Sequence, residues 1–330
     1  ASSRSWLTTA VSLGKLLVAA GLLTWLFSSG RLDFSSLREI HRWEYVWWAG
    51  GILLLNMVML VWRWLGLLHI QQLRVDWRTA LRITWFGYFA TVFLPGSAGG
   101  DLAKAYASCR HQPKAKTRAV STVFLDRALG LHSFLFIGSL AGLYVLARGC
   151  TSRQAGVVWL SILCLGLASG GLLLLLWRPS SGFAVRLLPR QFRTALADSL
   201  EFYRRARRRL FAIWCYSVLC NLSSIASYIL VATALGTQPT LAQVLAIPLA
   251  IVAGSLPISP GGLGVGEAAG SQLFGEFGLA HGGLIVLVVR LQTVVLSVPG
   301  ALAWLLPLRG RGTLDPRQCH EREPLSTTPR

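Results

Sequence analysis

The sequence contains LPGSAGGD at residues 94–101 and SPGGLGVGE at residues 259–267. Both stretches begin with an apolar or small residue followed by Pro-Gly, are rich in glycine, and end in a carboxylate, Asp101 or Glu267. The two Pro-Gly pairs are 165 positions apart and the two carboxylates 166. The two stretches therefore read as two copies of one motif.

Polar residues on either side of the motifs keep nearly the same spacing. Asn56 and Asn221 differ by 165 positions, and Arg127 and Arg290 by 163. A constant offset over such a distance indicates an internal duplication. We place the first repeat at 1–150, the second at 151–308, and a disordered cytoplasmic tail at 309–330.

The composition is that of a membrane protein. The chain has 330 residues, of which 53% are hydrophobic and 14% charged, and its mean hydropathy is +0.54. So few charges cannot cover a soluble surface. The prediction is an all-α polytopic membrane protein. Apolar runs of about 20 residues, long enough to cross the hydrocarbon core as helices, lie at 7–28, 46–68, 119–147, 157–177, 211–235 and 283–306.

The two glycine motifs lie in shorter apolar segments, at 80–107 and 240–276, each interrupted near its middle by Pro and Gly. Non-helical backbone at membrane depth is tolerated only where protein or a wet cavity surrounds it. We therefore interpret both segments as re-entrant helical hairpins rather than as spans.

The residues that give the net charge of +19 are concentrated in the loops predicted on one side of the membrane. Six spans with both termini in the cytoplasm place 24 of the 32 Lys and Arg on one side, and only five in the loops opposite. This is the positive-inside pattern, with attraction to anionic lipid, and it argues against a nucleic-acid partner. The basic segment 178–209 is either an amphipathic helix on the inner leaflet or a solvated basic loop.

The unit of the repeat is span, span, hairpin, span. The loops around the first hairpin are basic, so it enters from the cytoplasm, whereas the second hairpin enters from outside. Three crossings are an odd number, so the second copy is inverted relative to the first. Inverted repeats with broken helices near the midplane are typical of secondary transporters, whose substrate site lies at the repeat interface.

The hairpins offer a site for an anion. A helix that restarts after Pro and Gly points free N–H groups and its positive dipole end into the cavity. Asp101 and Glu267 are then N-terminal caps or charge partners. Arg127 and Arg290 lie well inside spans, where a charge costs about 2.5 to 3.5 kcal/mol and usually faces a partner or a wet cavity. They either grip an anionic headgroup, with Asp126 as internal counter-charge, or pair with the motif carboxylates.

Other polar residues receive simpler interpretations. Asn56 and Asn221 are expected to form interhelical hydrogen bonds, and Arg63 to reach the inner interface by snorkelling. The candidate headgroup-binding residues are Arg127, Arg290, Pro95, Gly96, Ser97, Gly99, Gly100, Asp101, Pro260, Gly261, Gly262, Gly264, Gly266 and Glu267, and the supporting residues are Asp126, Asn56, Asn221 and Lys104.

The chemistry of an enzyme is not visible in the sequence. It contains no HExxH, no GxSxG and no P-loop lysine, and the strand context of a nucleotide-binding fold is missing. The six cysteines are scattered without CxxC or Cys/His ligand spacing. We expect no catalytic residue, no metal, no cofactor and no disulfide framework.

At these residues the chain resembles the flippase-like integral membrane region of bacterial lysylphosphatidylglycerol synthases. The resemblance rests on the first motif, on Leu125-Asp126-Arg127 and on the second motif, and extends over about 10–306. The family favours Glu where Asp101 stands and an Arg near the place of Ser97, which bears on headgroup preference. The chain ends soon after the last span, so the resemblance implies translocation and not lipid synthesis.

The leading hypothesis is a lipid flippase that moves an anionic or headgroup-modified lipid, phospho- or glyco-, across the bacterial inner membrane. Its partners would be the bilayer and that lipid, and the sequence leaves homo-oligomerisation open. One alternative is a secondary transporter for a small anionic solute. Another is a membrane scaffold that recruits a lipid-modifying enzyme and transports nothing.

Overall fold

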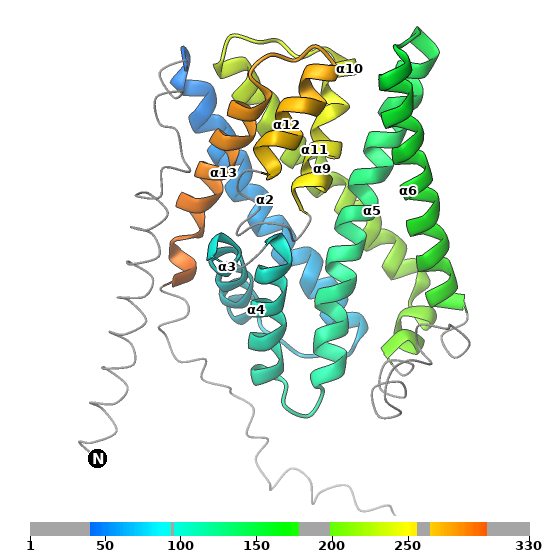
Figure 1. Ribbon diagram of the computed structural model, residues 1–330. Coiled ribbons are helices and arrows are strands. Elements are labelled where there is room, and N and C mark those ends of the chain that lie inside the picture. Colours follow the sequence, from blue (N-terminus) through cyan, green and yellow to red (C-terminus); the bar gives the residue numbers. More distant parts are fainter. Residues whose placement is uncertain (1–39, 94–95, 178–198, 256–264, 302–330) are drawn as a thin grey trace, which may run out of the picture.

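The computed structural model describes residues 40–93, 96–177, 199–255 and 265–301, and within these ranges the regular structure is entirely helical (Figure 1). Five helices are long and apolar enough to cross a membrane. They are α2 (Trp43–Ile70), α5 (Lys116–Arg148), α6 (Ser152–Trp177), α9 (Arg207–Ala234) and α13 (Gly282–Ser297), the last of which continues as a candidate span to Ala301. The protein is thus an all-α polytopic membrane protein, as predicted. The first predicted span, 7–28, lies outside the described residues.

The two glycine-rich segments form shorter helices, two in the first segment and three in the second. The first segment forms α3 (Trp77–Phe93) and α4 (Gly96–His111), and the second forms α10 (Leu241–Val244), α11 (Ala246–Gly254) and α12 (Val265–Glu276). Figure 1 shows the α3–α4 pair and the α11–α12 pair approaching the middle of the molecule from opposite ends. Helix α3 ends at Phe93 and α4 begins at Gly96, whereas α11 ends at Gly254 and α12 begins at Val265, and the predicted breaks between them lie outside the described residues.

The spans of the two halves of the chain pack on each other. Helices α2 and α9 run along one another in the most extensive of the helix contacts. Helix α5 packs against α9 and α11, and α13 packs against α2 and α3. The last span of each half therefore rests on the other half. Helix α6 lies at the edge of the bundle beside α5 (Figure 1).

Asparagine side chains join the central helices. Asn56 on α2 donates hydrogen bonds to the Cys220 carbonyl (2.5 Å) and the Ser223 hydroxyl (2.8 Å) on α9. Asn221 on α9 donates to the Gly130 carbonyl (2.9 Å) and to the Ser133 hydroxyl (2.8 Å) on α5. Both asparagines thus make the interhelical bonds that the sequence led us to expect.

Glycines set the closest helix contacts. A Cβ atom on Gly100 would lie 2.5 Å from the Gly87 carbonyl oxygen, so α4 approaches α3 more closely than any side chain permits. A Cβ atom on Gly282 would likewise lie 2.7 Å from the Gly270 carbonyl oxygen, where α13 meets α12. Close approach of this kind is what small residues provide in membrane helices.

Candidate functional site

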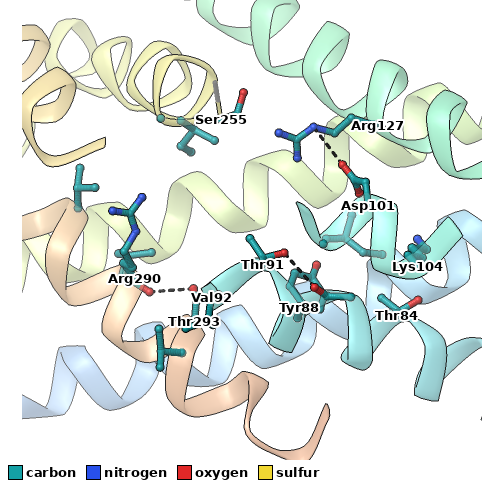
Figure 2. A pocket seen from close by; sticks show the side chains of 18 of the residues that line it. Thr84, Tyr88, Thr91, Val92, Asp101, Lys104, Arg127, Ser255, Arg290 and Thr293 are labelled. Carbon is teal, nitrogen blue, oxygen red and sulfur yellow. Dashed lines mark hydrogen bonds and ion pairs between the residues drawn. The ribbon is translucent and has the colours of Figure 1, made fainter. Parts of the chain in front are cut away.

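A cavity of about 360 Å³ lies where the two hairpins meet. Its walls come from α2, α3, α4 and α5 in the first half and from α9, α11 and α13 in the second. Gly100 and Asp101 reach it from one hairpin, and Gly254 and Ser255 from the other. Figure 2 shows the side chains that line it. The cavity therefore lies between the two halves of the chain.

Arg127 forms an ion pair with Asp101 on the wall of this cavity. Its Nε lies 3.6 Å from Asp101 Oδ2, and the two side chains are 32% and 35% exposed. Figure 2 shows the pair projecting from α5 and α4. The carboxylate of the first motif is thus a charge partner of Arg127, one of the two roles that the sequence left open. Contact of Arg127 with a substrate stays a prediction.

Arg290 lines the same cavity from α13. In Figure 2 it stands across the cavity from Arg127, with the hydroxyl-bearing face of α3 below and between them. The two arginines, 163 positions apart in the chain, therefore face one space from opposite halves.

Asp126 lies beside the cavity in a buried ion network. Its Oδ1 accepts a hydrogen bond from Arg63 Nε at 2.7 Å, and its Oδ2 accepts one from Lys104 Nζ at 3.0 Å. The three side chains are between 7% and 10% exposed. Asp126 is thus an internal counter-charge, but the cations on its two oxygens are Arg63 and Lys104, where Arg127 and Arg290 had been predicted.

The prediction for Arg63 was wrong. Instead of snorkelling to the inner interface, Arg63 turns inward and its Nη1 donates to the Ser217 hydroxyl on α9 at 2.9 Å. The residue is only 6% exposed. Burial of an arginine is favourable only when its charge is paired and its donors are bonded, and Asp126 and Ser217 supply both. The sequence did offer one indication of this network, because Arg63, Lys104 and Asp126 all lie within apolar segments of the same half.

Lys104 has a second partner, which sequence reasoning missed. Its Nζ lies 4.2 Å from the centre of the Trp64 ring, whose Nε1 donates to the Thr122 hydroxyl at 3.0 Å. A cation over an indole face is attracted by the ring quadrupole. Trp64 is fully buried and belongs to an apolar cluster with Val61, Ile83 and Ala119. The network is therefore rigidly seated between α2, α4 and α5.

The described wall of the cavity carries more positive than negative charge. The cations are Arg63, Lys104, Arg127 and Arg290, and the carboxylates are Asp101 and Asp126. Four cations against two carboxylates give a formal charge of +2 for the described lining. In a low-dielectric space such an excess attracts an anion strongly.

The remaining wall combines hydroxyls with apolar side chains. Thr84, Tyr88 and Thr91 follow one another at helical spacing on α3 and face the cavity (Figure 2). Val286 and Val289 of α13 line it from the other half. A space with both kinds of wall suits a molecule that has a charged end and an apolar body.

The other predicted site residues are only partly placed. Gly99 and Gly100 lie in the first turns of α4, and Gly100 lines the cavity. Gly96 and Ser97 begin α4, and Gly266 and Glu267 lie near the start of α12, but their side chains are outside the described set. The remaining residues, all outside the described ranges, are Pro95, Pro260, Gly261, Gly262 and Gly264. Most of 178–209 lies outside them as well.

Comparison with known protein families settles the relationship of the chain. The family model of the lysylphosphatidylglycerol synthase TM region matches residues 12–300. No curated protein and no solved structure matches the chain. Because the matched region takes in most of the sequence, including both glycine motifs and the cavity between them, this chain belongs to the family of the lysylphosphatidylglycerol synthase TM region.

Proposed function

We propose that the protein translocates a lipid with an anionic headgroup between the two leaflets of a bacterial inner membrane. The observation that carries the proposal is the cavity between the hairpins, with Arg127 and Arg290 on opposite walls and an excess of positive charge. Membership of a family named for lipid chemistry supports a lipid as the substrate. We propose no catalytic role for any residue of the chain.

In this proposal the headgroup occupies the cavity while the acyl chains remain in the bilayer. A phosphodiester bears one negative charge and several acceptor oxygens, which guanidinium groups bind with planar, paired donors. Arg127 and Arg290 would hold it from opposite sides, one from each half. A site that both halves share is expected to open toward either side when the halves rock against each other.

The proposed topology follows the basic loops. The ends of α3 and α4 away from the cavity carry Arg78, Arg82 and Arg110, and α9 begins with Arg207-Arg208-Arg209. We place these ends in the cytoplasm, with both termini on the same side. The second hairpin would then enter from the opposite face, as an inverted repeat requires.

The test is a translocation assay in proteoliposomes with fluorescent phosphatidylglycerol, comparing wild type with an Arg127→Gln, Arg290→Gln double variant. We expect the double variant to lose at least about tenfold in rate, since a charge-assisted hydrogen bond contributes roughly 1.5 to 3 kcal/mol. Arg153→Gln is the matched control, because its side chain is 82% exposed and is not among those that line the cavity. It should transport like wild type.

Native mass spectrometry from mild detergent adds a second readout. Selective retention of one anionic lipid class, lost in the double variant, would identify the headgroup to test. Translocation that persists in a folded double variant would refute the proposal. Transport of a soluble anion without any lipid movement would favour the small-solute carrier, and neither activity would favour the scaffold.

A further inference from the structure

The two carboxylates of the cavity have contrasting surroundings. Both oxygens of Asp126 are bonded to cations, at 2.7 and 3.0 Å, and its side chain is 10% exposed. Asp101 meets Arg127 through one oxygen at 3.6 Å, and its side chain is 35% exposed. Asp126 is fixed within a network, whereas Asp101 makes one long ion pair at the edge of the open space.

The groups that could balance Asp101 come from five elements. The charged or titratable residues around it are Lys104 on its own helix, Arg63 on α2, Tyr88 on α3, Asp126 and Arg127 on α5, and Arg290 on the opposite wall. Lys104 and Arg63 are already bonded to Asp126. Of the described cations, Arg127 is the one in direct contact with the Asp101 carboxylate.

An anionic headgroup competes with Asp101 for Arg127. If the phosphodiester takes the guanidinium, the carboxylate loses its contact while it remains in a largely apolar wall. An unpaired charge there is costly, and a carboxylate relieves that cost by binding a proton. Asp126 cannot do the same, because its protonation would leave two buried cations without a carboxylate.

We infer that Asp101 is a proton-coupling residue: binding of a phosphodiester headgroup at Arg127 displaces Asp101, which takes up one proton from the adjoining water. This inference rests on the proposed function. The guanidinium N–H···O contact to Asp101 is replaced by one to the phosphodiester, and an O–H bond forms on the carboxylate. The headgroup brings one negative charge and the proton one positive charge, so the net charge of the cavity is unchanged.

The experiment measures protons and lipid together. Protein in phosphatidylcholine nanodiscs is titrated with phosphatidylglycerol in weak buffer with a pH-indicator dye, and bound lipid is counted by native mass spectrometry. A phosphodiester has no second ionisation, unlike a phosphate monoester with its pKa near 6, so the lipid itself contributes no proton. We expect about one proton taken up per lipid bound, and an affinity that rises by up to about tenfold for each pH unit lowered.

The variants separate coupling from structure. Asp101→Asn mimics the protonated acid, and we expect it to bind phosphatidylglycerol with no proton uptake and no pH dependence. Asp101→Glu keeps the carboxylate and should keep the proton uptake. It shows that a loss of uptake in Asp101→Asn is not caused by misfolding after any change at this position. Asp76→Asn, an exposed carboxylate in the loop before α3, is the control and should behave like wild type.

The outcomes distinguish the two claims. Selective binding of phosphatidylglycerol without proton uptake in wild type, or equal uptake in Asp101→Asn, would overturn the coupling and leave the proposed function intact. Failure to bind phosphatidylglycerol in preference to phosphatidylcholine would count against the proposed function itself. A further arm uses soluble glycerophosphoglycerol: proton-linked binding as tight as that of the lipid would show that the site takes free phosphodiesters rather than lipid headgroups.

Discussion

The first and second halves of the chain fasten the second limb of their hairpins to the following span by different chemistry. In the first half, Lys104 on α4 bonds to Asp126 on α5, which also holds Arg63. At the duplication offsets of 165, 166 and 163, the counterparts of Arg63, Lys104 and Asp126 are Tyr228, Gly270 and Val289. The second half therefore has no such triad at these positions.

In the second half, close packing takes the place of charge. Gly270 on α12 lies against Val286 and Gly282 of α13, so near that a Cβ atom on Gly270 would meet the Val286 Cγ2 at 2.5 Å. The first half thus joins its helices by an ion network with defined hydrogen bonds, and the second half by close packing of a helix face that carries glycine. A pair of helices can be fixed either way, and only the ionic way brings additional charge to the cavity wall.

The largest expected effect comes from breaking the ionic contact. Asp126→Asn leaves Arg63 and Lys104 buried without a carboxylate, and we expect a loss of about 3 to 5 kcal/mol in the free energy of unfolding. The measurement is unfolding in mixed detergent micelles, followed by circular dichroism.

A triple variant sharpens this test. Asp126→Leu combined with Arg63→Met and Lys104→Met replaces the ions by apolar groups, and such replacements are often neutral or stabilising. We expect the triple variant to have a larger free energy of unfolding than Asp126→Asn and to bind anionic lipid less tightly than wild type. A single variant within about 1 kcal/mol of wild type would show that the network contributes little to stability.

The next effect addresses the glycine contact. Gly270→Ala introduces a methyl group into the space held by Val286, and overpacking of this kind costs about 1 to 3 kcal/mol. Adding Val286→Ala removes the obstructing atom, so the double variant should lose less than the sum of the two single losses.

Gly275 on the same helix is the control for that series. A Cβ atom there would meet no atom within 4 Å, so Gly275→Ala should be neutral or raise stability by about 0.5 to 1 kcal/mol. Equal losses at both glycines would mean that helix contact is not what Gly270 provides.

The asparagine bonds between the halves are expected to contribute less. Asn221→Ala removes two hydrogen bonds to α5, and Asn56→Ala removes two to α9. Interhelical hydrogen bonds in membranes contribute about 0.6 kcal/mol on average and up to about 1.7, so each variant should lose about 1 kcal/mol in detergent unfolding. Cys215→Ala, at an exposed position of α9, should lose nothing measurable.

The smallest expected loss in the free energy of unfolding comes from changing the side chains that cap the first helix of each hairpin. Asp76 accepts a hydrogen bond from the Thr79 amide at 3.1 Å, and the hydrogen bonds from Thr79 hold the pKa of Asp76 below its ordinary value of 3.8. Its stabilisation is therefore complete above pH 3.8 and is lost as the pH falls through the lower pKa of the folded state. Asp76→Ala should lose about 0.5 to 1 kcal/mol at neutral pH, and less in acid.

The second hairpin offers a counterpart that does not titrate. The Thr240 amide donates to the Gln243 side chain at 2.8 Å at the start of α10. Gln243→Ala should cause a similar loss that stays constant with pH. If the loss from Asp76→Ala is also constant between neutral and acid pH, the carboxylate is not the group responsible.

Much of the fold could be predicted because it depends on the length of apolar runs. The run at 119–147 became α5, and the apolar segment at 80–107 became two helices, α3 and α4, rather than one long span. The site was predicted less completely. The spacing of Arg127 and Arg290 predicted that they occupy equivalent places in the two halves, and both residues line the one cavity.

Pairing of Arg127 with Asp101 was one of the alternatives that the sequence offered, but the partners of Arg63 and Asp126 could not be predicted, for a physical reason. Whether Arg63 snorkels or turns inward depends on the rotation of α2 about its axis and on which carboxylate a neighbouring helix places beside it. A hydropathy profile predicts neither of these. Asp126 follows Leu125 and precedes Arg127 in the chain, but helical geometry points adjacent side chains about 100° apart, toward different neighbours. The neighbouring positions of Asp126 and Arg127 in the chain therefore do not determine their partners.

The charge network also bears on the order in which the protein is made. Arg63, Lys104 and Asp126 all lie within residues 63–126, so the bonds among these three residues can form before α9 is made, and only the bond from Arg63 to Ser217 has to wait for that helix. By contrast, α2 and α5 must wait for α9 and α11 to cover their apolar and asparagine-bearing faces. A nascent first half can thus leave the translocon with Asp126 already bonded to both of its cations, and the later helices complete the bundle around this network.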